Sequence, residues 1–193
     1  MKPRYIVLMA LGALALVGCG AQPTGTPPAT GEHGSMSQAE HGSTQTSDAP
    51  YDAQFIDGMT IHHKGAVAMA EQALEASQRP EIKELAQTII ATQNPEIEQM
   101  AAWRQEWYPD VPTTHGTGGH MGDMELSSDT SIPFDQRFIT AMIGHHEGAI
   151  AMAKEAQTKA EHAEIKQLAG EIIQAQEAEV QQLQAWQQAW FAQ

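Results

Sequence analysis

Two copies of one short motif bring together side chains that can bind a soft metal ion. Met59 is followed three and four residues later by His62 and His63. The same pattern returns at Met142, His145 and His146. Residues three and four apart on a helix lie on adjoining turns of one face, so a thioether and two imidazoles could reach one ion. The motif therefore predicts one metal site in each copy.

The types of ligand narrow the choice of metal. A methionine sulfur is a soft, neutral ligand that suits Cu(I), and imidazole binds Cu(I), Cu(II) and Zn(II), whereas Ca²⁺, Mg²⁺ and Fe³⁺ prefer oxygen. The chain has no Glu followed three residues later by His, which is the pattern of di-iron helical bundles. Copper is therefore the predicted ion, as Cu(I) or Cu(II).

Other methionines and histidines are further candidate ligands. Met69 and Met152 lie two turns beyond the histidine pair of each motif, roughly 10 Å by helical rise. Their spacing favours core packing, with a second metal site as the alternative. A Gly-rich segment between the two copies contains His120, Met121 and Met124. For this cluster a copper-binding role and no metal role are both open, because the glycines impose no geometry.

The motifs lie within an internal repeat. Residues 52–108 align without a gap on residues 135–191, 83 positions later, and nearly half of the aligned positions are identical. Within each copy the apolar residues and histidines are spaced by three and four, which is typical of one helical face. The period-two alternation of strands is absent. Each copy therefore predicts a pair of helices.

The two helical pairs predict an all-α, antiparallel four-helix bundle built from tandem hairpins. We assign the hairpins to residues 50–108 and 131–193, with a linker at 109–130. One hairpin cannot bury all of its apolar surface, so we expect the two to pack about a pseudo-twofold axis. A swapped or paired dimer is the alternative arrangement.

Prolines and glycines refine this prediction. Pro50 and Pro133 stand where the first helix of each hairpin begins, and Pro80 opens the second helix of the first hairpin. Gly65 and Gly148 each follow a histidine pair. They are predicted to permit the close approach of another helix.

Antiparallel packing within each hairpin places the histidines opposite polar residues. With the turns near residues 78–79 and 161–162, His62 lies level with Glu96 and His145 lies level with Glu179. Gln93 and Gln176 lie one turn away on the same faces. A buried polar group without a partner costs about 1–3 kcal/mol. Either these groups bind a metal, or they hydrogen-bond one another and fix the helical register.

The N-terminus has the features of an exported lipoprotein. Lys2 and Arg4 precede an apolar run, Tyr5–Leu16, that is too short for a comfortable membrane span and typical of an export signal. Small residues precede the one cysteine, Cys19, as in the lipobox of bacterial lipoproteins. We expect a signal peptide at residues 1–18 and a lipid anchor on Cys19. An ordinary export signal is the alternative.

A polar segment follows the expected anchor. Residues 19–49 are rich in Gly, Ser, Thr, Pro and Gln, so they bury too little apolar surface to order themselves and are predicted to be a flexible tether. The role of its histidines, His33 and His41, is open. An anchored protein of this kind lies in the cell envelope and faces the periplasm or the cell exterior.

Charge and motif content exclude other classes of function. The 193-residue chain has 24 acidic against 10 Lys and Arg residues and a formal charge of −14, which argues against nucleic acid as a partner. No nucleophile with an adjacent base, phosphate-binding loop or pair of catalytic acids is recognisable. The sequence therefore does not predict an enzyme.

The repeated pattern Phe-Ile-x-x-Met-x-x-His-His-x-Gly-Ala-x-Ala-Met-Ala resembles that of a bacterial family, DUF305, and the resemblance covers residues 51–191. It implies a ferritin-like four-helix architecture and an exported or membrane-anchored protein. Some members bind copper in the periplasm and contribute to copper resistance. The resemblance further implies copper binding through Met59, His62, His63 and Met69, and through their second-repeat counterparts. Relatives often have more methionines in the linker, so a high-capacity linker site is not expected here.

Together these observations predict a cell-envelope lipoprotein that binds copper for sequestration, tolerance or transfer. Its predicted partners are copper ions and the membrane, through Cys19, and a homodimer or a copper-transfer partner is open. One alternative is a structural or partner-docking helical lipoprotein without a metal role. Another is a ferritin-like oxidase or di-metal enzyme, against which the missing Glu-x-x-His pattern counts.

Overall fold

The computed structural model describes residues 49–114 and 126–191, in which all regular secondary structure is helical. The helices are α1 (Tyr51–Ala76), α2 (Pro80–Trp107), α3 (Phe134–Lys159) and α4 (Ala163–Phe191). None of these helices has the length and hydrophobicity of a membrane span. The predicted signal peptide, Cys19, the tether up to residue 48 and the linker candidates His120, Met121 and Met124 lie outside the described residues.

The helices begin and end close to the predicted positions. Pro50 and Pro133 immediately precede α1 and α3, and Pro80 is the first residue of α2. Proline suits these positions because its fixed φ matches a helix and its missing N–H would have no partner in the first turn. Helix α2 continues through Pro95. Both hairpin turns are short, so consecutive helices in each repeat run antiparallel.

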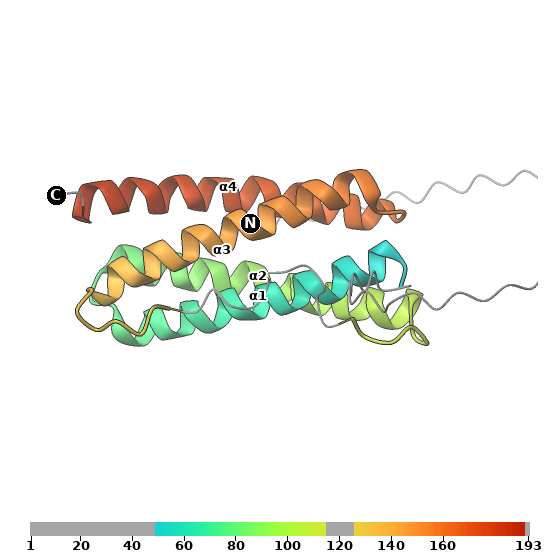
Figure 1. The fold of residues 1–193 in the computed structure, drawn as a ribbon, viewed down its shortest axis with the longest axis horizontal. Helices are drawn as coiled ribbons and strands as arrows, with labels where there is room; N and C mark the ends of the chain where they lie inside the picture. The colour runs from blue at the N-terminus through green and yellow to red at the C-terminus, as the bar shows by residue number, and fades with distance from the viewer. Residues whose placement is uncertain (1–48, 115–125, 192–193) are drawn as a thin grey trace, which may run out of the picture. The chain divides into compact units, whose positions relative to one another are not determined.

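Within residues 49–114 and 126–191, the two hairpins meet mainly through their first helices. Helix α1 packs along α2, α3 packs along α4, and α1 also packs against α3 (Figure 1). The predicted all-α bundle of two tandem hairpins is therefore confirmed.

The core of the bundle consists of two apolar clusters, each with residues from all four helices. The first cluster joins the beginning of α1 to the end of α3 and includes Phe55, Met59, Met100, Ala153 and Ile172. The second cluster joins the end of α1 to the beginning of α3 and includes Met69, Ile82, Phe138, Met142 and Leu183. Helices α1 and α3 are thus antiparallel, and each half of the core depends on both repeats.

The turn of the second hairpin is held by the first repeat. The buried carboxylate of Asp52 accepts hydrogen bonds from the backbone N–H groups of Glu161 and His162, at 3.0 and 2.9 Å, and lies 2.7 Å from His162 Nδ1. Burial alone would raise the pKa of Asp52, but the hydrogen bonds from His162 and Glu161 outweigh burial and lower it. The His162 ring also stacks on Trp107, with ring centroids 3.9 Å apart.

The turn of the first hairpin contacts the second repeat through the side chain of Arg79. Arg79 occupies the position equivalent to His162, 83 residues earlier. Its guanidinium pairs with Asp135 at 3.2 Å and lies 4.2 Å from the ring centroid of Trp190. Because equivalent residues make reciprocal contacts, the two repeats are related by the predicted pseudo-twofold axis.

Candidate metal centre

A layer of four histidines separates the two apolar clusters, and we call it the histidine layer. His62 and His63 come from α1, and His145 and His146 come from α3; all four are buried. On α2 and α4 the matching positions between the two clusters are occupied by Gln93 and Gln176, which are also buried. The predicted polar patches therefore form one continuous layer across the bundle.

Equivalent histidines of the two repeats contact each other at the centre of this layer. The ring centroids of His62 and His145 are 3.8 Å apart, and their planes are tilted by 50°. Because these are the same position of the repeat, the contact lies at the pseudo-twofold axis. The periodicity of one hairpin could not predict it, since it depends on how α1 packs on α3.

The glycines after each histidine pair make room for these rings. A Cβ atom at Gly65 would lie 3.1 Å from His145 Nε2, and one at Gly148 would lie 3.2 Å from His62 Nε2. The predicted close approach at both glycines is therefore confirmed, and the approaching group is a histidine of the other repeat.

Replacing Gly65 or Gly148 with alanine is not expected to raise the free energy of unfolding, although this change normally stabilises a helix. Replacing a helix-interior glycine by alanine stabilises a helix by about 1 kcal/mol, but here the new methyl group displaces an imidazole in a packed layer. Gly170→Ala is the matched control, because its Cβ would meet only the end of the Gln157 side chain, at 3.3 Å. Denaturant unfolding should give G65A and G148A a free energy of unfolding about 1 kcal/mol or more below that of G170A. Equal gains in all three would contradict this account.

The other histidine of each pair contacts a glutamate of the same hairpin. His63 Nε2 and Glu96 Oε2 are 2.7 Å apart in a hydrogen bond. His146 Nε2 and Glu179 Oε2 are also 2.7 Å apart, at an angle less favourable for a hydrogen bond. Glu96 and Glu179 thus lie at the predicted height along the bundle. The histidines that they contact are His63 and His146, not His62 and His145.

Burial keeps the central histidines neutral. Desolvation, followed by the positive charges of the neighbouring histidines, lowers the pKa of His62 from 6.5 to about 4. The same causes lower the pKa of His145. Both imidazoles are therefore uncharged near neutral pH, so a metal ion would not have to displace a proton from an imidazolium there.

Several polar atoms of the layer are buried without a hydrogen-bond partner. They include Nδ1 of all four histidines and Oε1 of both glutamines, Gln93 and Gln176. An unpartnered buried polar atom costs about 1–3 kcal/mol. Without a bound cation these unpartnered atoms destabilise the folded protein. A cation could bind to their lone pairs.

Two of the predicted methionine ligands border the histidine layer, and two lie away from it. Met59 and Met142 are fully buried, one in each apolar cluster, and each is one helical turn before the second histidine of its motif. Met69 is buried within the second cluster, and Met152 packs against the first. Their positions agree with the core-packing role that spacing favoured.

The two histidines of each motif have different neighbours. His62 lies against His145 of the other repeat, whereas His63 lies against Glu96 of its own hairpin. Within residues 49–114 and 126–191, no three His, Cys, Asp or Glu side chains are grouped so that they could hold a metal ion. Other donor atoms near the layer include the sulfurs of Met59 and Met142 and the unpartnered oxygens of Gln93 and Gln176.

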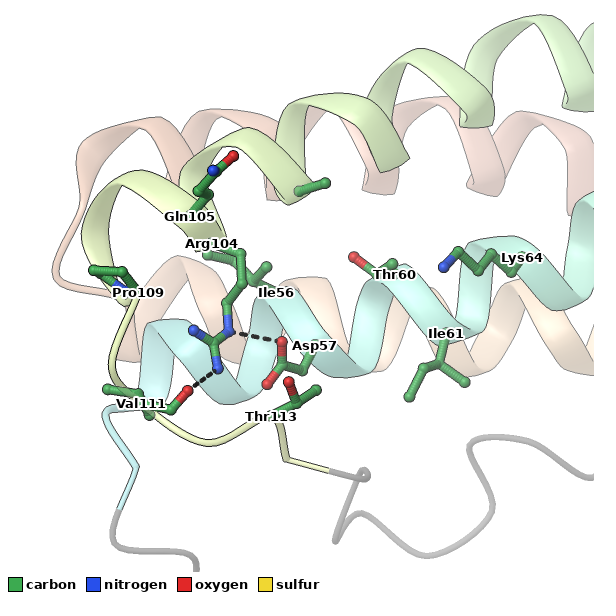
Figure 2. A pocket seen from close by; sticks show the side chains of 11 residues that line it. Ile56, Asp57, Thr60, Ile61, Lys64, Arg104, Gln105, Pro109, Val111 and Thr113 are labelled. Atoms are coloured by element: carbon green, nitrogen blue, oxygen red, sulfur yellow. Dashed lines mark hydrogen bonds and ion pairs between the residues drawn. The ribbon is translucent and has the colours of Figure 1, made fainter.

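A cavity of about 570 Å³ lies between α1, α2 and the segment that follows α2 (Figure 2). At one end Asp57 accepts a hydrogen bond from Arg104 Nε at 2.8 Å, and Arg104 Nη2 donates to the Val111 carbonyl at 2.7 Å. Thr114 N–H also donates to Asp57, at 2.8 Å. These bonds tie the chain after α2 to α1. None of the lining residues is a predicted metal ligand.

Sequence reasoning did not identify the Asp57–Arg104 pair, although the repeat contains a signal for it. The equivalent positions in the second repeat are Thr140 and Gln187, whose side chains are joined by a 3.2 Å hydrogen bond. A charged pair in one repeat is thus matched by a neutral pair in the other. Joint changes of this kind between aligned repeats indicate contact.

Comparisons with known proteins agree with this architecture. The family model described as "Domain of unknown function (DUF305)" matches residues 52–187. No curated protein matches the chain. Among solved structures, CopM in the Cu(II)-bound form is similar, with 40% sequence identity, a TM-score of 0.65, and coverage of 72% of this chain and 97% of that chain.

Two further solved structures are also similar. CopM in the Cu(I)-bound form has 38% identity and a TM-score of 0.63, with coverage of 72% and 97%. A DUF305 fragment from Deinococcus radiodurans has 27% identity and a TM-score of 0.60, with coverage of 71% of this chain and 95% of that chain.

Proposed function

The chain belongs to the DUF305 family, and from this membership we propose that it binds copper ions through its histidine layer. The observation that carries the proposal is the set of four buried imidazoles whose Nδ1 atoms have no partner. Solved relatives at 38–40% identity, the CopM structures, contain Cu(I) or Cu(II). The residues that would hold copper are Met59, His62 and His63 in the first repeat and Met142, His145 and His146 in the second.

The donor types support a soft ion. The layer offers neutral nitrogen and the flanking clusters offer thioether sulfur, which together suit Cu(I) and, through nitrogen, Cu(II). Bound copper would supply a positive charge to the unpartnered lone pairs and so relieve the cost of burying them. This role is sequestration or transfer of the ion and requires no catalysis by the chain.

The proposed location is the cell envelope. The apolar run before Cys19 and the small residues that precede it support export, followed by lipid attachment at this cysteine. A polar tether would then separate the copper-binding bundle from the membrane surface. A protein so placed would bind copper in the periplasm or at the cell exterior.

A competition titration tests the proposal. The metal-free protein is titrated with Cu(I) under anaerobic conditions against a chromogenic chelator, and the expected dissociation constant is below about 1 μM, equivalent to more than about 8 kcal/mol of binding free energy. X-ray absorption of the loaded protein should then show both sulfur and nitrogen neighbours. Binding weaker than micromolar would favour the alternative, in which the histidines only fix helical register for a structural or docking protein.

A further inference from the structure

Glu96 and Glu179 are the carboxylates that contact the histidine layer. Each has Oε2 at 2.7 Å from Nε2 of a histidine in its own hairpin, His63 or His146. Both histidine side chains are completely buried, and the glutamate side chains are only 20% and 13% exposed. In the first repeat Nε2 of His63 is therefore already hydrogen-bonded to a carboxylate, and in the second repeat a carboxylate lies at the same distance from Nε2 of His146 without making a hydrogen bond.

This contact determines which nitrogen of His63 carries the proton. A carboxylate can only accept a hydrogen bond, so Nε2 of His63 must be the N–H. The other nitrogen, Nδ1, is buried and has no partner. A proton on Nδ1 would be a buried donor without an acceptor, which costs about 1–3 kcal/mol. The contact therefore places the proton of His63 on Nε2 and leaves a bare lone pair on Nδ1.

That tautomer leaves a metal ion the one nitrogen that the glutamate does not contact. An imidazole binds a metal through an unprotonated nitrogen and usually donates its other N–H to a carboxylate or carbonyl, which fixes the ring and makes it a better ligand. At His146 the carboxylate is at the same distance from Nε2, but neither Nε2 nor Nδ1 makes a hydrogen bond. In both repeats a glutamate thus lies beside Nε2, and Nδ1 is buried without a partner.

We propose that Glu96 and Glu179 are positioning residues for the copper site, and that Nδ1 is the ligand atom of His63 and His146. The glutamates do not touch the ion. Each holds a proton on Nε2 and fixes the ring, which leaves Nδ1 free and oriented. The inference rests on the proposed function, because it names the atoms through which copper would be held.

Nitrogen-15 NMR of the protein labelled at histidine tests the tautomer directly. Couplings between the ring nitrogens and the carbon-bound ring protons distinguish the two neutral tautomers and the imidazolium. In the metal-free protein, His63 and His146 are expected to be protonated at Nε2. On addition of Cu(I), which is diamagnetic, the Nδ1 resonances should shift while Nε2 keeps its proton.

A matched pair of double variants tests the two glutamates. Glu96→Gln with Glu179→Gln removes both carboxylates from the layer, and a glutamine can accept or donate, so both tautomers become populated. The control, Glu98→Gln with Glu177→Gln, makes the same change in charge at exposed positions. We expect about 10- to 100-fold weaker Cu(I) binding in E96Q/E179Q and unchanged binding in E98Q/E177Q. Circular dichroism checks that both variants remain helical.

Three results would overturn the inference while leaving copper binding in place. These are a proton on Nδ1 in the metal-free protein, loss of the Nε2 proton when copper binds, and equal copper affinity in the two double variants. Failure of the unmodified protein to bind Cu(I) would instead remove the proposed function, and this inference with it.

Discussion

Replacing the four histidines of the layer with alanine is expected to remove most of the copper bound by the helical bundle. His62, His63, His145 and His146 supply every imidazole of the layer, and the methionines alone leave only sulfur as a ligand. We expect the Cu(I) affinity of this part of the chain to fall by about 100-fold or more, equivalent to about 2.7 kcal/mol. The chelator competition assay measures the loss, and circular dichroism should show the helices intact.

His162→Ala is the matched control for this experiment. It removes the one other histidine within the described part of the chain, where the ring stacks on Trp107 and contacts Asp52. Copper binding should be unchanged in this variant. If four alanines unfold the bundle, four glutamines replace them, since Gln93 and Gln176 already occupy the same layer. Copper stoichiometry equal to that of the unmodified protein in the folded quadruple variant would refute the assigned ligands.

The metal-free protein is expected to lose stability steeply on mild acidification. In the unfolded chain His62 and His145 take up protons near pH 6.5, whereas in the folded chain the pKa of His62 is about 4 and that of His145 is also lowered. Between these values the unfolded state binds more protons than the folded state. The free energy of unfolding should therefore fall as pH decreases from 7 to 4, by up to about 1.4 kcal/mol per pH unit for each group.

Urea unfolding at half-unit pH steps measures this slope. The matched variant, His62→Gln with His145→Gln, keeps a polar side chain at both positions but has nothing to titrate, so its slope should be smaller. Asp52 acts in a different window, since its stabilising contribution is lost only as pH falls below the ordinary carboxyl value of 3.8. Equal slopes in the two proteins between pH 7 and pH 4 would show that the central histidines are not held neutral by the fold.

The helices could be predicted because their signals are local. Prolines at positions 50, 80 and 133 mark three of the four helix starts, and the three-and-four spacing of apolar residues marks the faces that become buried. The position of the turn near residue 78 determines which residues of α1 and α2 lie opposite each other. It correctly placed Glu96 opposite a histidine of the first motif.

The orientation of each histidine could not be predicted from the same signals. Consecutive residues on a helix point about 100° apart, so His62 and His63 cannot both face α2. Which of them does so depends on where α3 packs on α1, and that packing joins residues more than 80 positions apart. The contact between His62 and His145 follows from this tertiary choice, as does the pairing of His63 with Glu96.

The reciprocal contacts of the two repeats have a consequence for the origin of the layer. His62 contacts His145, and each ring lies against a glycine of the other repeat, Gly65 or Gly148. Each hairpin turn also contacts the opposite repeat. These are the contacts of an isologous interface, in which one surface recognises its own copy. Two separate molecules of a single ancestral hairpin could form the same layer. Joining them in one polypeptide would then fix their stoichiometry and let the halves diverge, as Arg79 and His162 have done.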